Sequence, residues 1–134
     1  MNLPIQIREL EKSYPDGFRR KNKILHRISL EVHPREVFGF IGPNGAGKST
    51  TINLMMGFTR PDAGMVRVHG LPPVQPESRR NIGYLPEGPR FYENLTAEEL
   101  LWFAARSAGI ARDDFQKTVD PLLDMLSILH VKKR

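Results

Sequence analysis

The sequence has 134 residues, 40% of them hydrophobic, which suits one domain with its own core and is too short for two ordinary domains. It contains no cysteine, which excludes disulfides, thiolate metal sites and cysteine nucleophiles and fits a reducing compartment. The formal charge of +5 comes entirely from residues 1–87, where 13 Lys and Arg face 8 Asp and Glu, because residues 88–134 hold 7 of each kind.

The first elements expected are two strands, residues 5–10 and 28–33, in which apolar and polar side chains alternate. The start of the chain has neither the pattern of a signal peptide nor the roughly 18 apolar residues of a membrane span, so we expect a cytoplasmic protein. Five basic residues between the strands are interpreted as a solvated loop and not as a nucleic-acid contact, because no aromatic side chains interleave with them. They are Arg19, Arg20, Lys21, Lys23 and Arg27.

A third strand is expected at residues 36–41, EVFGFI, a nearly unbroken apolar run of the kind that is buried on both faces of a mixed or parallel sheet. It leads into a glycine-rich loop. The following stretch, KSTTINLMMGF, predicts a short buried helix that is closed by Gly57. Strand, glycine loop and helix therefore follow one another in that order.

Further along, residues 60–64 predict a turn, residues 65–70 a strand, residues 71–80 a proline-rich loop, and residues 81–87 a strand that ends at Pro86. The character of the chain then changes. We expect its boundary near residues 86–95, with a nucleotide-binding core and β-subdomain in residues 1–87 and the start of a helical subdomain in residues 88–134.

Two helices are predicted in the second part. Thr96 and Glu99 form a capping box for the first, whose expected apolar face consists of Leu100, Leu101, Phe103 and Ala104. The second is expected over residues 112–129, kinked or divided by Pro121. Its expected apolar face consists of Phe115, Val119, Leu122, Leu123 and Leu126.

The glycine loop matches the pattern G-x-x-x-x-G-K-[ST]. Its glycines let successive backbone N–H groups converge on one point, and the helix that follows adds its positive end, so the loop suits phosphate. The lysine reaches the β- and γ-phosphates, and the serine hydroxyl suits Mg²⁺. The predicted binding residues are Gly42, Pro43, Asn44, Gly45, Ala46, Gly47, Lys48, Ser49 and Thr50, with Ser49 as a metal ligand.

Guanine specificity is disfavoured. A GTPase would normally supply an N-K-x-D element and a D-x-x-G switch. Here Asn22-Lys23 is followed by Ile24-Leu25, and none of the six aspartates has glycine three residues later.

The sequence GPNGAGKST, preceded by ISLEVHPREVFGFI and followed by GFTRPDAGMVRVHG and NIGYLPE, resembles the N-terminal half of an ATP-binding cassette (ABC) domain, most like those of exporters. The resemblance covers about residues 3–130. It implies an α/β P-loop NTPase fold: a mixed sheet with an N-terminal antiparallel β-subdomain and the start of a helical subdomain. It also implies ATP and Mg²⁺ as ligands, with a membrane-spanning subunit and a second cassette subunit as partners.

The resemblance assigns roles to two more residues. Tyr14 matches the aromatic residue that stacks on adenine, and Glu87 stands where the family commonly has a glutamine that approaches Mg²⁺, so it is a candidate metal ligand. The sequence also departs from the family at Arg35, in a turn that usually has glycine. If that turn needs a positive φ, arginine costs about 1 kcal/mol, whereas a type I turn would make it nearly neutral.

The remaining parts of an ATP-hydrolysing site are not found in the sequence. The family has an apolar strand ending in Asp-Glu, a later histidine and an L-S-G-G-Q-like signature, whereas the aspartates after residue 90 all fall in the amphipathic helical stretch. The four histidines are expected at the surface: His26, His33, His69 and His130. We therefore expect a truncated nucleotide-binding (motor) subunit of an ABC transporter, in which these residues bind ATP and only the full-length protein hydrolyses it. The alternatives are part of a non-transport ABC ATPase, acting on ribosomes or in DNA repair, and a nucleotide-binding module without turnover.

Overall fold

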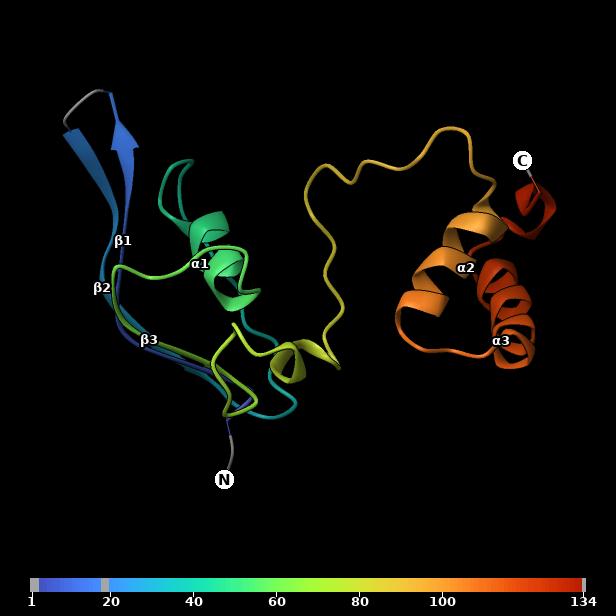
Figure 1. Cartoon of the computed structure of the whole chain (residues 1–134), viewed down its shortest axis with the longest axis horizontal. Helices are drawn as coiled ribbons and strands as arrows, with labels where there is room; N and C mark the ends of the chain where they lie inside the picture. Colours follow the sequence, from blue (N-terminus) through green and yellow to red (C-terminus); the bar gives the residue numbers. More distant parts are fainter. Residues whose placement is uncertain (1–2, 18–19, 134) are drawn as a thin grey trace. The chain divides into compact units, whose positions relative to one another are not determined.

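The computed structural model describes residues 3–17 and 20–133 of the chain. The chain divides into two compact units, Met1–Ile82 and Gly83–Arg134, and each is described here by itself (Figure 1). Among the described residues, no helix combines the length and apolar character that crossing a bilayer requires.

The first unit is built on a three-stranded antiparallel sheet in the order β2-β1-β3 (Figure 1). The strands are β1 (Ile5–Asp16), β2 (Arg20–Val32) and β3 (Ala63–Val68). All three strands contain, or largely overlap, ranges predicted from the sequence, but the β1–β2 hairpin is much longer than expected.

The basic stretch before residue 28 was predicted to be a loop, and for its described residues this prediction is wrong, because they belong to β2. Cross-strand ion pairs explain how the strand accommodates the charge. Lys23 Nζ lies 2.9 Å from Glu11 Oε2, and Arg27 Nη2 lies 2.6 Å from Glu9 Oε2. The prediction for Arg19 falls outside the described residues.

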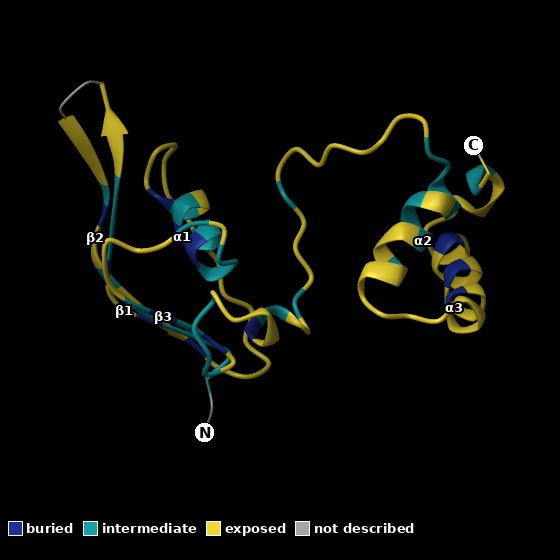
Figure 2. Cartoon of the chain, in the orientation of Figure 1, coloured by how far each residue is buried: buried dark blue, intermediate teal, exposed yellow. Residues whose placement is uncertain are grey.

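The core of the first unit lies between the sheet and helix α1 (Lys48–Met55), and Figure 2 shows buried residues on both elements. Gly57, with a φ of 71°, lies just beyond the C-cap of α1, so the predicted short helix closed by a glycine is confirmed. A short 3₁₀ turn, η1 (Pro76–Arg79), lies within the stretch predicted to be a proline-rich loop. The buried core residues are Ile7, Leu10, Leu25, Leu54, Val66 and Val68.

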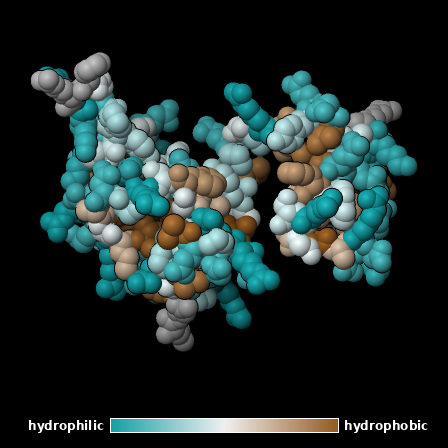
Figure 3. All heavy atoms as spheres, in the orientation of Figure 1, coloured by the Kyte–Doolittle hydropathy of each residue, from teal (hydrophilic) through white to brown (hydrophobic). Residues whose placement is uncertain are grey.

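Two predicted strands, residues 36–41 and 81–87, are wrong for this structure, which has no regular secondary structure at either place. A strand of a parallel sheet needs hydrogen-bonding neighbours, and the described part of the chain gives it none. Val37 and Ile41 are consequently 100% and 98% exposed, and Leu85 is 80% exposed. Figure 3 shows apolar side chains at the surface of the first unit.

The second unit consists of helices α2 (Ala97–Ser107) and α3 (Arg112–Met125) and a 3₁₀ turn, η2 (Leu129–Val131) (Figure 1). The predicted capping box is confirmed: Thr96 Oγ1 accepts a hydrogen bond from Glu99 N at 3.2 Å, and Thr96 N donates to Glu99 Oε2 at 2.8 Å. Both ends of the pattern satisfy N–H groups that the first turn leaves without helical partners.

The apolar face predicted for α2 is partly wrong. Phe103 is 60% exposed, whereas Trp102 packs against Phe115 of α3 with ring centroids 5.2 Å apart. Leu101 and Ala105 complete the contact, so the buried face is rotated by about one residue from the predicted one. On α3, Phe115, Val119 and Leu123 are buried at intervals of four, while the predicted Leu122 and Leu126 are exposed.

Pro121 does not divide α3, contrary to one of the two outcomes predicted for it. The helix runs through the proline and ends at Met125, four residues earlier than expected. Pro121 removes the bond that its N–H would make to the carbonyl of Lys117. Val119 and Leu123, on either side of the proline, are both buried in the cluster formed with α2, so both halves of the helix pack on the same neighbour.

Replacing Thr96 with alanine is expected to destabilise the second unit by about 1 kcal/mol, because the Glu99 N–H loses its acceptor. Trp102 is the only tryptophan, and it packs on α3, so its fluorescence during urea unfolding reports on this unit alone. The matched control is Thr118→Ala, which removes a hydroxyl bonded to the Asp114 carbonyl within α3. Equal midpoints for Thr96→Ala and the unmodified chain would contradict the prediction.

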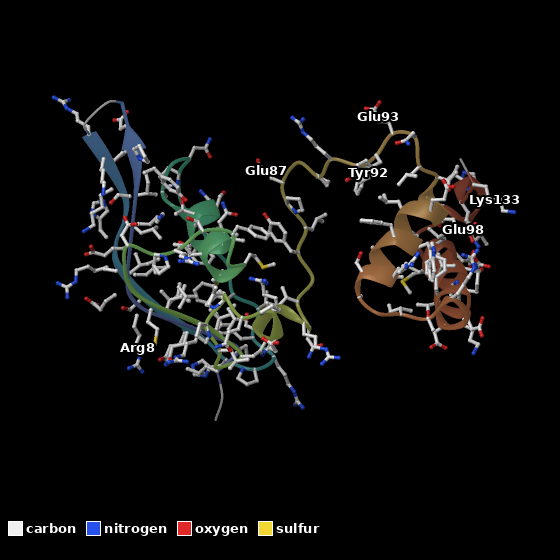
Figure 4. All side chains as sticks on the ribbon, viewed as in Figure 1. Arg8, Glu87, Tyr92, Glu93, Glu98 and Lys133 are labelled. Carbon is white, nitrogen blue, oxygen red and sulfur yellow. The ribbon has the colours of Figure 1, made fainter. Side chains whose placement is uncertain are left out.

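Lys132 joins the end of the described chain to both helices of the second unit. Its Nζ lies 2.6 Å from Asp120 Oδ1 on α3 and 3.1 Å from Glu98 Oε1 on α2. The hydrogen bond from Lys132 is the main reason why the pKa of Glu98 lies below its ordinary value of 4.5, and the bonds to Asp120 and then Glu98 raise the pKa of Lys132 above 10.5. Figure 4 shows Glu98 among the side chains at this end of the helices.

These shifts predict how the second unit responds to acid. Because the pKa of Glu98 is lower in the folded chain, its stabilising contribution is complete above about pH 4.5 and is lost as the pH falls below that value. Glu98→Gln should therefore unfold more easily at neutral pH and lose less stability on acidification. Urea midpoints of Trp102 fluorescence at several pH values test this, with the exposed Glu93→Gln as control. Parallel pH profiles for all three proteins would contradict it.

Candidate functional site

The glycine-rich loop of the first unit curls tightly before α1. Gly45 and Gly47 have φ values of 84° and 87°, in the left-handed region that other residues rarely adopt. Ala46 N donates to Pro43 O at 3.2 Å and closes the turn in which Asn44 and Gly45 lie. The backbone conformation that the sequence pattern requires is therefore present.

The loop is anchored to the sheet at Gly47. A Cβ on this residue would lie only 2.5 Å from Leu25 Cδ2 of β2 and 3.3 Å from Ile24 Cγ2, so a side chain fits there only if the buried Leu25 moves. The Thr51 N–H and Oγ1 both donate to Gly47 O, at 2.9 Å each, and Thr51 is 1% exposed. Sheet, loop and helix thus meet at one residue that favours glycine.

The Lys48 side chain folds back across the loop. Its Nζ donates to Gly42 O at 2.6 Å and to Pro43 O at 2.8 Å. These carbonyls belong to exposed residues, and they hold the ammonium group over the turn. The ammonium is therefore held over the backbone of the loop, and an anion bound by the loop would lie close to it.

The start of α1 offers donors to an anion. Its N-cap, Gly47, provides no side-chain cap, and the first turn contains no acidic residue. The first N–H groups of a helix lack intrahelical acceptors, and they carry the positive end of the helix dipole. Ser49 is exposed and Thr50 is half-buried beside it in the first turn. These backbone donors, together with the Lys48 ammonium and the exposed Ser49 hydroxyl, fit a phosphate chain with its metal ion.

In the described part of the chain, cavities lie beside both ends of α1. One of about 360 Å³ lies between β2 and the loop and is lined by Leu25, Ala46, Gly47 and Lys48 among others. A larger one of about 660 Å³ lies at the other end of α1, beside Gly57, and no residue of the loop lines it. The smaller cavity is therefore the one that belongs to the candidate site.

Tyr14 lies on β1 with 36% of its surface exposed. Lys12 Nζ is 5.4 Å from the centre of its ring, a cation–π distance. Lys12 is in turn the cross-strand partner of Leu25, which contacts Gly47. Tyr14 thus lies two residues along β1 from Lys12, and Lys12 pairs with Leu25, which packs against the glycine loop.

Three other predictions from the sequence concern Glu87, Arg35 and the histidines, and their outcomes differ from one another. Glu87 is exposed on the irregular segment of the second unit that leads to α2 (Figure 4), and its metal-binding role stays a prediction. Arg35 has a φ of 64°, so the turn does need the left-handed conformation, and arginine bears the cost anticipated for it. The four histidines are exposed as expected. The described residues contain no group of three His, Cys, Asp or Glu side chains suited to a metal.

The sequence pattern missed the residues that hold the loop in place. Thr51 follows the motif directly, but its buried hydroxyl bond is invisible without the fold. Leu25 on β2 and Lys12, its partner on β1, come from parts of the chain far from the loop. Their roles arise from strand pairing and from contacts across the sheet, for which no local signal exists.

The site consists of a glycine loop that precedes helix α1, a lysine that folds across the loop, and a sheet that packs against it. This arrangement defines a P-loop nucleotide-binding protein. The ABC transporter family model matches residues 25–134. The chain belongs to the ABC transporter family. The fold class predicted from the sequence, α/β with an antiparallel β-subdomain and the start of a helical part, is confirmed by a solved "ATP binding subunit of ABC transporter". That structure has a TM-score of 0.80 and 30% identity over 96% of this chain.

Curated relatives agree. The Nod factor export ATP-binding protein I of Burkholderia thailandensis is 34% identical over 93% of this chain, and the uncharacterized ABC transporter ATP-binding protein YxlF of Bacillus subtilis is 34% identical over 92%. Human ATP-binding cassette sub-family A member 2 is 30% identical over 94%. The chain spans 40% and 39% of the two bacterial relatives, and 52% of the solved subunit.

Proposed function

We propose that this chain binds Mg·ATP through residues 42–50, as the nucleotide-binding part of an ABC transporter. The observation that carries the proposal is the geometry at Gly47, where a left-handed backbone, locked against Leu25, opens a helix whose first N–H groups have no side-chain cap. Those donors and the Lys48 ammonium suit an oxyanion. Family membership makes ATP the expected nucleotide.

Each predicted residue has a role in this proposal. On binding, Lys48 exchanges the Gly42 and Pro43 carbonyls for the β- and γ-phosphate oxygens. The backbone of the loop, from Asn44 to Thr50, surrounds the phosphates. Ser49 supplies a hydroxyl to Mg²⁺, which neutralises phosphate charge. Tyr14 stacks on adenine, and Glu87 supplies a second oxygen to the metal.

The wider assembly is also part of the proposal. The chain would work at the cytoplasmic face of a membrane, attached through a membrane-spanning subunit and paired with a second cassette. The name of the Burkholderia relative favours export as the direction of transport. Hydrolysis needs a Mg²⁺-binding aspartate, a carboxylate for water and a signature from a partner, none of which the sequence supplies. Hydrolysis is therefore assigned to the whole protein and not to these 134 residues.

The experiment measures binding and turnover on the same sample. Calorimetry should show saturable Mg·ATP binding, while phosphate release stays at the level of a buffer blank. Ser49→Ala in the chain and Glu87→Gln in a full-length context should each raise the Mg²⁺ concentration needed for half-maximal binding. Absence of saturable binding would refute the proposal. Steady phosphate release that survives repurification and is lost in Lys48→Ala would refute the assignment of hydrolysis.

A further inference from the structure

Tyr14 is held by a chain of contacts that leads back to the P-loop helix. Lys12, two residues before Tyr14 on β1, is on the same face of the strand, and its ammonium lies 5.4 Å from the ring centre. The Lys12 side chain is only 13% exposed, although it carries a charge. A lysine so well covered needs partners for that charge, and it has them on another segment.

Those partners lie in the loop that follows α1. Lys12 Nζ donates to Arg60 O at 2.7 Å and to Asp62 Oδ1 at 3.2 Å. Asp62 also accepts from Ser13 N at 2.7 Å through Oδ2, and its own N–H donates to Glu11 O at 2.9 Å. Asp62 therefore bonds the backbone on both sides of Lys12 and the Lys12 ammonium as well.

The bond from Lys12 and the Ser13 N–H both lower the pKa of Asp62, so the carboxylate is ionised at neutral pH. The ammonium meets a full negative charge there. Because one face of the Tyr14 ring is occupied by the ammonium, a base that stacks on Tyr14 has the other face. The contact thus positions the ring from one of its faces.

The same segment of β1 also contacts the P-loop through the neighbouring strand β2. Lys12 pairs across the sheet with Leu25, whose methyl group limits the space at Gly47. The loop that carries Asp62 begins where α1 ends, and α1 begins at the P-loop. Lys12, which contacts the Tyr14 ring, is therefore linked to the P-loop in two ways. One link runs through Leu25 on β2, and the other runs through Asp62 and α1.

We propose that Lys12 and Asp62 are positioning residues that hold Tyr14 at the adenine end of the nucleotide site. The inference rests on the proposed function, because it assumes that phosphates bind at the P-loop and that Tyr14 stacks on the base. It goes further because it proposes that the Lys12–Asp62 ion pair sets the distance between the Tyr14 ring and the P-loop. Neither residue touches the nucleotide, so their removal should affect the base contact and leave phosphate binding intact.

The test compares Mg·ATP with magnesium tripolyphosphate, which has the phosphates and no base. Lys12→Met keeps most of the length of the side chain and removes its charge. It should weaken Mg·ATP binding by roughly three- to tenfold, a part of what a lost base stack costs, and leave tripolyphosphate binding unchanged. Asp62→Asn should act in the same direction. In a Tyr14→Ala background, which itself weakens Mg·ATP binding, Lys12→Met should have no further effect.

The matched control is Lys23→Met, since Lys23 is a lysine of the same hairpin that pairs with Glu11 instead. It should leave both affinities unchanged. Equal weakening of ATP and tripolyphosphate in Lys12→Met would show a general structural role and overturn the inference. So would an unchanged ATP affinity in Lys12→Met or in Tyr14→Ala. Failure of the unmodified chain to bind tripolyphosphate would instead overturn the proposed function, and this inference with it.

Discussion

Replacing Lys48 with alanine is expected to weaken Mg·ATP binding at least tenfold. The substitution removes a charge-assisted contact to two phosphates, and such hydrogen bonds are worth about 1.5 to 3 kcal/mol, where about 1.4 kcal/mol is a factor of ten. In the structure the ammonium already lies over the loop, bonded to Gly42 O and Pro43 O. Binding therefore needs only an exchange of acceptors and no new ordering of a long side chain.

The loop itself should survive this substitution. Gly42 and Pro43 are exposed, so water can replace the ammonium at their carbonyls, and the anchor at Gly47 does not involve Lys48. Calorimetric titration of Mg·ATP checks the affinity, and circular dichroism checks the fold. Lys117→Ala is the control, because Lys117 is 77% exposed on α3 and pairs only loosely, at 3.8 Å, with Asp114. Equal affinities for the two variants would remove the loop from the nucleotide site.

Replacing Gly64 with alanine is expected to cause the largest loss of stability in the first unit. Gly64 has a φ of 84°, and a Cβ built there would overlap the carbonyl of Glu9 on the neighbouring strand. The left-handed backbone costs a non-glycine residue about 1 to 2 kcal/mol, and overpacking a further 1 to 3 kcal/mol. Because the obstacle is backbone, it can yield only if β1 and β3 move apart.

Gly17→Ala separates the cost of the left-handed backbone from the cost of overpacking. Gly17 has a φ of 72°, but a Cβ there would meet no atom of the described residues within 4 Å, so only the cost of the left-handed backbone applies and a loss of about 1 to 2 kcal/mol is expected. Urea unfolding followed by circular dichroism should place the midpoint of Gly64→Ala well below that of Gly17→Ala. Trp102 fluorescence, which reports on the second unit, should be the same in both. Coincident midpoints would show that the strands adapt to the added methyl group without cost.

Several features of this protein could be predicted because their signals are local. The pattern of glycines with Lys48 and Ser49 specifies a backbone turn and a charge, and both are present. The box formed by Thr96 and Glu99 also depends only on residues three apart. A sequence pattern predicts such features well because all the atoms involved belong to one short segment.

The wrong predictions concern contacts with distant segments. The apolar run at residues 36–41 has the composition of a buried strand, but burial depends on neighbours that the described residues do not provide, so Val37 is fully exposed. The face of α2 was misjudged for the same reason, since α3 alone decides that Trp102 and not Phe103 is covered.

The sequence by itself therefore determined the kind of ligand that we propose. The order of glycines, lysine and serine predicts a phosphate-binding loop, and the flanking segments indicate an ABC domain. The tertiary structure alone decided how that loop is held: Leu25 against Gly47, the Thr51 hydroxyl on the Gly47 carbonyl, and Lys12 with Asp62 beside Tyr14. The physical reason is that a local motif fixes backbone conformation and charge, whereas its position relative to other groups depends on strand pairing and packing between residues far apart in the chain.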